Sequence, residues 1–271
     1  MRDTRSHGPV SNAPVAGLRG DYTEADHALW RRLYERQIRL MPGYACEEFQ
    51  HSLEKLDASR EIPNFEQTTR ALKRATGWQI VAVPGLIPDL TFFEHLSERR
   101  FPVTRWLRKP EEFDYIVEPD VFHDFFGHVP LLFDPMFADY MQAYGTGGLK
   151  AARLDALKML ARLYWYTVEF GLIATPAGPR IYGAGILSSG GEVVHAIESP
   201  RPQRIRFDLE RVMRTDYNID RYQDTYFVID SFENLFSATA PDFTAIYERV
   251  RSETALAPDE HASGDVPARA H

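Results

Sequence analysis

The sequence lacks the features that mark disulfide-stabilised, membrane-spanning and nucleic-acid-binding proteins. Cys46 is the only cysteine, which excludes an internal disulfide and a site of paired thiolates and fits a reducing compartment. No apolar run approaches the length of a signal-peptide core or a membrane span. The formal net charge of -8 disfavours a nucleic-acid surface, because phosphate contacts need clustered cations. We therefore expect a cytoplasmic protein that binds neither membrane nor nucleic acid.

Composition changes near both ends of the chain. Residues 1–20 and 254–271 are rich in small and polar residues and in proline, and they lack hydrophobic periodicity, which predicts disordered tails. Between them we find no internal repeat and no low-complexity linker. The chain is 44% hydrophobic, enough to fill one sizeable core. The sequence thus predicts a single domain over residues 21–253.

Helical periodicity dominates this domain. Thr23 and Asp26 have the spacing of an N-cap and its partner, and Asn64 is placed to cap a second helix. The longest apolar stripe predicts a helix from about Leu149 to about Leu172. Short strand-like segments occur at residues 78–85 and 100–108 and around residues 180–187, whereas residues 225–232 have a mixed pattern. Because βαβ alternation, GxGxxG and a P-loop are all missing, we predict a predominantly helical α+β fold with short β-strands.

Two of the nine histidines stand out. His123 and His128 lie in the apolar segment EPDVFHDFFGHVPLLFDP, where an unpaired imidazole is costly. Residues five apart in an α-helix point about 140° from each other. The two rings can therefore meet at one ion only if the helix ends or distorts between them, and Gly127 and Pro130 are expected to supply that break. The alternative is a pair of core histidines bonded to carbonyls.

Glu169 is the carboxylate that could join them. It lies between Val168 and Phe170 on the most hydrophobic predicted helix, where a charge must be paired or coordinated. A salt bridge to a buried arginine would also satisfy it. Two histidines and one carboxylate match the facial triad of non-haem Fe(II) enzymes. Zinc hydrolases use the same ligand set, so the ligands alone leave the metal open.

Three motifs in order carry a family resemblance. EPDVFHDFFGHVPLL, YWYTVEFGL and YGAGILSS resemble the pterin-dependent aromatic amino acid hydroxylases, in particular their bacterial, phenylalanine-hydroxylating members, over about residues 21–250. The resemblance implies a mainly helical catalytic domain that uses Fe(2+), O₂ and tetrahydrobiopterin or a related tetrahydropterin to hydroxylate L-phenylalanine to L-tyrosine. It also implies a monomer, because the chain has no room for the regulatory domain and oligomerisation helix of animal members.

The resemblance further implies roles for individual residues. The iron ligands would be His123, His128 and Glu169. The substrate site would comprise Arg108, as a bidentate clamp on the substrate carboxylate, with Asp120, Trp165, Gly185 and Ser188. The pterin site would comprise Gly85, Leu86, Ile87 and the stacking aromatic Phe92. Tyr164 would lie close to the iron, and Asp124 stands where many members carry a glutamate near the pterin.

The choice of substrate depends on three of the pocket positions. Trp165 is bulky where tryptophan hydroxylases usually carry phenylalanine, and Ile219 offers no partner for a phenol hydroxyl. Both favour phenylalanine, whereas Ile116 replaces a small hydroxyl residue of the animal enzymes at the pocket rim. The same chemistry on tryptophan or at the meta position stays open. More distant alternatives are a zinc hydrolase with Asp124 as its base and a non-catalytic metal-binding domain.

Overall fold

The structure is a computed structural model that describes residues 22–268 apart from positions 115, 117 and 241. The tail predicted over residues 1–20 lies outside this range. The helices are α1 (Glu24–Leu40), α2 (Glu47–Leu53), α3 (Phe65–Ala75), α4 (Asp89–Ser97), α5 (Pro135–Arg153), α6 (Leu157–Tyr164), α7 (Ala184–Leu187), α8 (Gly190–Glu198), α9 (Leu209–Arg214), α10 (Phe232–Thr239) and α11 (Thr244–Ser252). Two 3₁₀ segments are η1 (Pro110–Glu112) and η3 (Pro130–Phe133), and two π-helices are η2 (His123–His128) and η4 (Trp165–Glu169).

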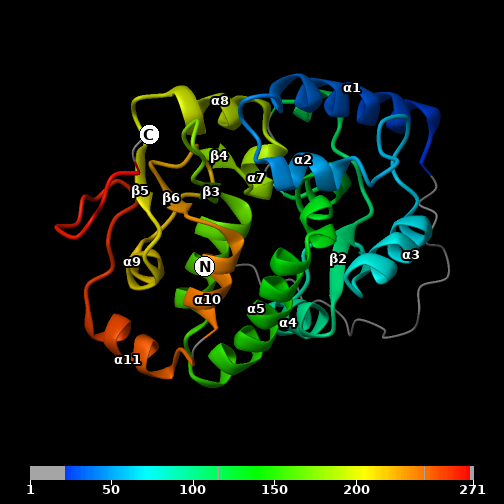
Figure 1. Ribbon diagram of the computed structural model, residues 1–271. Coiled ribbons are helices and arrows are strands. Elements are labelled where there is room, and N and C mark those ends of the chain that lie inside the picture. Colours follow the sequence, from blue (N-terminus) through cyan, green and yellow to red (C-terminus); the bar gives the residue numbers. More distant parts are fainter. Residues whose placement is uncertain (1–21, 115, 117, 241, 269–271) are drawn as a thin grey trace, which may run out of the picture.

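Six short strands form two small sheets. They are β1 (Gln79–Val83), β2 (Arg100–Thr104), β3 (Leu172–Ile173), β4 (Arg180–Ile181), β5 (Gln203–Arg206) and β6 (Thr225–Ile229). Strands β1 and β2 pair in parallel, and the second sheet has the order β4-β3-β6-β5, with only β3 and β4 antiparallel. The two sheets lie on opposite sides of the molecule with α5 between them (Figure 1). The predicted helical α+β class is confirmed.

Helix α1 begins at the predicted cap. The Asp26 backbone N–H donates to Thr23 Oγ1 (3.2 Å), and the Thr23 backbone N–H donates to the Asp26 carboxylate (2.8 Å), which completes a capping box. The Asn64 side chain likewise accepts from two backbone N–H groups at the start of α3. Among the described residues, no helix is long and apolar enough to span a membrane.

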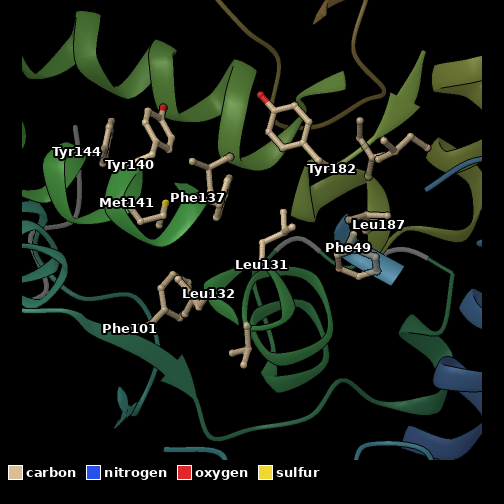
Figure 2. Close-up of a cluster of buried hydrophobic side chains, with 14 of the residues drawn as sticks. Phe49, Phe101, Leu131, Leu132, Phe137, Tyr140, Met141, Tyr144, Tyr182 and Leu187 are labelled. Atoms are coloured by element: carbon tan, nitrogen blue, oxygen red, sulfur yellow. The ribbon is translucent and has the colours of Figure 1, made fainter. Parts of the chain in front are cut away.

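A continuous core rich in aromatic side chains connects these elements. Figure 2 shows part of it, where Phe101 from β2 and Phe137 and Tyr140 from α5 lie among aliphatic side chains. Helices α4 and α5 pack closely because Gly148 has no side chain: a Cβ there would lie 2.1 Å from Phe93 Cδ1. This contact holds α4 against α5. It thereby also holds the segment between β1 and α4.

The single helix predicted from about Leu149 to about Leu172 is wrong. Helix α5 ends at Arg153, and Asp155 has a φ of 52°, in the left-handed region that non-glycine residues rarely adopt. The chain then restarts as α6 and passes directly into the π-helix η4. The apolar stripe continues across the break, so hydrophobic periodicity alone gave no sign of it.

The disordered tail predicted from residue 254 is also wrong for residues 254–268. Leu256 forms a bridge with Thr215 at the end of α9, and Pro267 forms one with Ile205 on β5. The segment thus adds backbone hydrogen bonds to two elements of the domain. Its low hydrophobic content misled the prediction, because it is held mainly by polar contacts.

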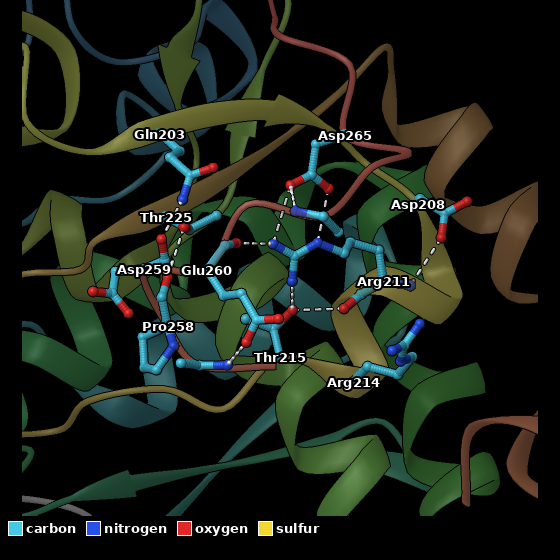
Figure 3. Close-up of polar contacts among 12 residues, drawn as sticks. Gln203, Asp208, Arg211, Arg214, Thr215, Thr225, Pro258, Asp259, Glu260 and Asp265 are labelled. Carbon is cyan, nitrogen blue, oxygen red and sulfur yellow. Dashed lines mark hydrogen bonds and ion pairs between the residues drawn. The ribbon is translucent and has the colours of Figure 1, made fainter. Parts of the chain in front are cut away.

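One of these contacts is a buried ion pair, shown in Figure 3. Arg211 Nε donates to Asp265 Oδ1 (2.8 Å) and Arg211 Nη2 donates to Asp265 Oδ2 (3.2 Å). The same guanidinium donates to the Glu260 carbonyl and to Thr215 Oγ1, both at 2.6 Å. Every nitrogen of the Arg211 side chain therefore has an acceptor. Two of the four acceptor atoms are the carboxylate oxygens of Asp265.

Removing this carboxylate tests how the C-terminal segment is anchored. We expect Asp265→Ala to lower the free energy of unfolding by about 3 kcal/mol, because it leaves the Arg211 charge buried and unpaired. Asp230→Ala is the matched control: it removes the partner of Arg206 in an exposed pair, and the expected loss is about 0.5 kcal/mol. Urea unfolding measures both, and equal losses would contradict the anchoring role.

Candidate active site

Both segments that carry the predicted metal ligands are π-helices. Segment η2 begins with His123 and ends with His128, and η4 ends with Glu169. Hydrogen bonds in a π-helix span five residues rather than four, so the wider turn brings positions five apart towards the same face. The expected distortion between the two histidines is confirmed: the helix widens across Gly127, the π-helix ends at His128, and Pro130 begins the 3₁₀ segment η3.

Gly127 has a further function in this turn. A Cβ at Gly127 would lie 2.9 Å from the Ala184 carbonyl oxygen, so its missing side chain lets α7 pack against η2. That contact places Ser188, the residue after α7, beside His123. The local sequence thus positions a metal ligand through a neighbouring helix.

The three predicted ligands converge. His128 Nε2 lies 3.1 Å from His123 Nε2 and 3.1 Å from Glu169 Oε1, and His123 Nε2 lies 3.6 Å from Glu169 Oε2. Ligands about 2.1 Å from one ion and at right angles to each other would lie about 3 Å apart. In the part of the chain that the structure describes, this is the only group of three or more histidine, cysteine, aspartate or glutamate residues whose ligand atoms lie close enough to share one metal ion. The donor set fits one metal ion held on a single face.

Electrostatics prepare these groups for ligation. Burial lowers the pKa of His123, which keeps its ring neutral. Burial alone would raise the pKa of Glu169, but its contacts with the two imidazoles, with His128 first, outweigh burial and lower that pKa, so the carboxylate is ionised. Burial opposes a proton on His128, yet Glu169 outweighs burial and raises the His128 pKa. A bound cation would displace that proton.

A hydrogen-bond chain orients the first histidine. Ser188 Oγ donates to the Ala184 carbonyl (2.8 Å), so it acts as acceptor for His123 Nδ1–H (2.9 Å). The proton on Nδ1 leaves the lone pair of His123 Nε2 facing the other ligands.

Asp120 joins the metal ligands to a buried arginine. Its Oδ1 accepts from the His123 backbone N–H (3.0 Å) and from Arg108 Nη2 (3.0 Å), and its Oδ2 accepts from Arg108 Nε (2.9 Å). Asp120 is fully buried and Arg108 is 3% exposed. One carboxylate therefore fixes the His123 backbone and the guanidinium together.

A cavity of about 330 Å³ opens beside these groups. Its walls include the metal ligands His123 and Glu169, and most of the predicted substrate residues, namely Arg108, Trp165, Gly185 and Ser188. Asp120 is absent from the walls because it lies behind Arg108. Ile116 and Ile219, which entered the prediction of substrate, also line this cavity, as does Leu86. The volume suits a ligand the size of an amino acid.

The other predicted residues lie outside these walls. Tyr164 stacks near His128, with ring centroids 6.3 Å apart, and Phe92 packs edge-on against Tyr164 at 5.6 Å. Asp124 Oδ2 accepts from the Thr104 backbone N–H at the end of β2 (2.7 Å), and burial raises the pKa of Asp124. Gly85 and Ile87 lie in the segment between β1 and α4, on either side of Leu86.

Sequence reasoning missed several polar residues of the cavity wall, among them the buried Glu192 and Gln223. Glu192 Oε1 accepts from Tyr226 Oη–H (2.8 Å) and from the Gln223 backbone N–H (3.1 Å). Burial nevertheless raises the pKa of Glu192 from 4.5 to about 7. Neither Glu192 nor Gln223 belongs to a local motif, so only the folded structure identifies them.

Comparison with known proteins decides the family. Residues 14–250 match the family described as biopterin-dependent aromatic amino acid hydroxylase. The chain belongs to this family. Among curated relatives of this hydroxylase, the phenylalanine-4-hydroxylase of Ralstonia nicotianae is 63% identical over 245 residues, 90% of this chain and 78% of the relative. That of Caulobacter vibrioides is 56% identical over 266 residues, 94% and 90% of the two chains.

Solved structures agree with this assignment. The iron- and phenylalanine-bound crystal structure of Chromobacterium violaceum phenylalanine hydroxylase superposes on the hydroxylase with a TM-score of 0.90 at 56% identity, covering 94% of each chain. The cobalt-bound form of the same relative has a TM-score of 0.89 at 58% identity and covers 91% of this chain and 89% of the relative. Family and ligand geometry together make His123, His128 and Glu169 the iron site of the hydroxylase.

The hydrogen bond to His123 leads to a prediction about metal affinity. We expect Ser188→Ala to weaken Fe(II) or Co(II) binding about 10-fold or more, because the imidazole loses the partner that fixes its orientation. Ser189→Ala is the control, since the Ser189 hydroxyl accepts from the Glu192 backbone N–H at the start of α8 and not from a metal ligand. Competition with a chelator measures both affinities. Equal affinity in the Ser188→Ala variant and the unmodified protein would contradict the orienting role.

The raised pKa of Glu192 leads to a prediction about stability. The folded-state pKa of Glu192, about 7, exceeds the ordinary value of 4.5, so the folded protein binds this proton more tightly than the unfolded chain does. The stability that comes from the bound proton is fully present below pH 4.5 and is lost as the pH rises through 7. Glu192→Gln removes this titration. Between pH 5 and 8 we expect the free energy of unfolding to shift by roughly 2–3 kcal/mol in favour of the variant. Urea unfolding at both pH values measures it, and a constant difference would show that Glu192 does not titrate in this range.

Proposed function

We propose that this hydroxylase converts L-phenylalanine to L-tyrosine, with O₂ and a reduced tetrahydropterin as cosubstrates. The observation that carries the proposal is one cavity with the iron site in its wall and a buried, oriented guanidinium facing it. The phenylalanine-4-hydroxylases at 56–63% identity support the same reaction.

Arg108 is proposed to bind the carboxylate of the amino acid. Asp120 occupies Arg108 Nε and one N–H of Nη2, so the remaining N–H groups are available to the cavity that Arg108 lines. Because Arg108 Nε and Nη2 each donate to a different oxygen of Asp120, the guanidinium is oriented before the substrate binds. A planar bidentate donor in that position aligns a carboxylate in one orientation.

The aromatic ring of the substrate is proposed to lie against Trp165. The Trp165 ring is held between Tyr217, stacked at 4.2 Å, and Phe170 at 4.7 Å. Gly185 lies against Phe170, where a Cβ would be 2.8 Å from Phe170 Cζ, so its missing side chain lets α7 pack against this aromatic wall. We propose that the wall holds the substrate ring beside the iron ligands. Holding the reacting groups in place is the main contribution that the chain can make.

When bound, iron together with a reduced pterin supplies O₂ activation and oxygen transfer to the ring. We propose that Gly85, Leu86, Ile87 and Phe92 bind the pterin. Of these, Leu86 reaches the cavity wall, and Phe92 contacts Tyr164, which in turn packs near His128. Asp124 is proposed to be a catalytic residue near the pterin. It lies beside the metal ligands, and its carboxylate accepts from the Thr104 backbone N–H. The expectations of a cytoplasmic location and of a monomer remain predictions.

Aerobic turnover tests the reaction and the iron ligands together. We expect para-tyrosine from L-phenylalanine when the purified protein is supplied with Fe(II) and a tetrahydropterin, and none when either is omitted. Glu169→Ala should lower the iron content and reduce the rate at least 100-fold, on the order of what loss of a metal ligand causes. Chromatography separates para- from meta-tyrosine.

Glu47→Ala, a change on the exposed first turn of α2, serves as the control and should leave turnover unchanged. Meta-tyrosine as the product would keep the iron assignment and change the ring position. A protein without turnover of any aromatic amino acid would refute the proposed function, and bound zinc in that protein would point to a hydrolase.

A further inference from the structure

Gln223 is a buried node in the cavity wall. Its side chain accepts from Trp165 Nε1–H (3.0 Å) and donates to the Asn218 carbonyl (3.0 Å). Its backbone N–H donates to Glu192 Oε1 (3.1 Å), and its carbonyl accepts from His195 Nε2 (3.2 Å). Only 2% of Gln223 is exposed. One residue thus connects α8, the segment before β6 and the aromatic wall.

The contact with Trp165 is the one that bears on the substrate. Stacking on Tyr217, with an interplanar angle of 15°, fixes the plane of the indole but allows two orientations that differ by a half-turn about the Cβ–Cγ bond. The indole has a single donor, Nε1–H, and a buried donor requires an acceptor. Among the described residues, Gln223 Oε1 is the acceptor that this group has. Gln223 therefore determines which edge of the indole faces the cavity.

The backbone contacts explain why Gln223 itself cannot shift. Glu192 and His195 both lie on α8 and hold the peptide groups on either side of the Gln223 α-carbon. The Asn218 carbonyl fixes the amide nitrogen, which leaves the oxygen aimed at Trp165. With all of its polar groups bonded, the side chain cannot rotate without leaving a buried group unsatisfied.

We propose that Gln223 is a positioning residue that determines ring specificity: through Trp165 Nε1 it sets the width of the cavity beside the iron ligands. The inference rests on the proposed function, because it concerns the substrate ring. A purely structural role would act through Asn218 and α8 and would be independent of the indole N–H.

A double-mutant cycle separates these two roles. We measure kcat/KM for L-phenylalanine and L-tryptophan in the wild type, Gln223→Leu, Trp165→Phe and the double variant. Where tryptophan turnover is undetectable, its inhibition constant against phenylalanine replaces it. We expect Gln223→Leu to reduce the preference for phenylalanine about 3- to 10-fold, the range that one lost hydrogen bond allows. In the Trp165→Phe background, which lacks the indole N–H, Gln223→Leu should have no further effect.

Three further variants complete the test. Gln223→Glu keeps an oxygen acceptor for Trp165 but loses the N–H that is donated to the Asn218 carbonyl. It should therefore lose stability while the preference stays within about 2-fold, on the scale of a hydrogen bond that is retained. Gln50→Leu, which removes an amide that donates to the Ala45 carbonyl, is the control and should leave the preference unchanged. Gln223→Met, closer in shape to glutamine, takes the place of Gln223→Leu if the latter does not fold.

The outcomes are distinguishable. The inference is overturned if Gln223→Leu leaves the preference unchanged, or if it changes the preference equally in the wild type and in Trp165→Phe. In either case phenylalanine turnover by the wild type would still support the proposed function. A wild type that does not hydroxylate phenylalanine would overturn the proposed function itself, and the inference with it.

Discussion

An ionised carboxylate and two imidazoles lie together where the apolar core meets the cavity, and the rest of the site is arranged around this constraint. A buried charge without a partner is costly, so Glu169, His123 and His128 can share the space only as ligands of a cation or as partners of one another. Their ligand atoms are 3.1–3.6 Å apart, the spacing that suits one metal ion. Iron binding and folding of the surrounding helices are therefore thermodynamically coupled.

Two departures from α-helical geometry meet the constraint. A π-helix is a rare conformation that tertiary contacts must maintain. At His123–His128 those contacts include the close approach of α7 at Gly127 and the bond from the His123 backbone to Asp120. Because Asp120 also holds Arg108, a metal ligand and the proposed substrate clamp share one support. The two sides of the cavity cannot move independently.

Local patterns predicted the elements whose information is local. Thr23 and Asn64 cap their helices as expected, since a cap depends on three or four adjacent residues. Prediction failed at the long helix through Asp155, where a backbone reversal leaves the apolar stripe intact. It also failed for residues 254–268, where the decisive contact joins Arg211 to a carboxylate 54 residues away.

By itself, the sequence determined which side chains needed partners: two imidazoles and one carboxylate in apolar surroundings are anomalous wherever the chain places them. Only the tertiary structure decided how those partners meet. The widening of the helix between His123 and His128, the turn of Asp124 towards β2 and the position of Gln223 at Trp165 all depend on segments far apart in the chain. The energies of such contacts arise from packing and desolvation on folding, and no local pattern of residues records them.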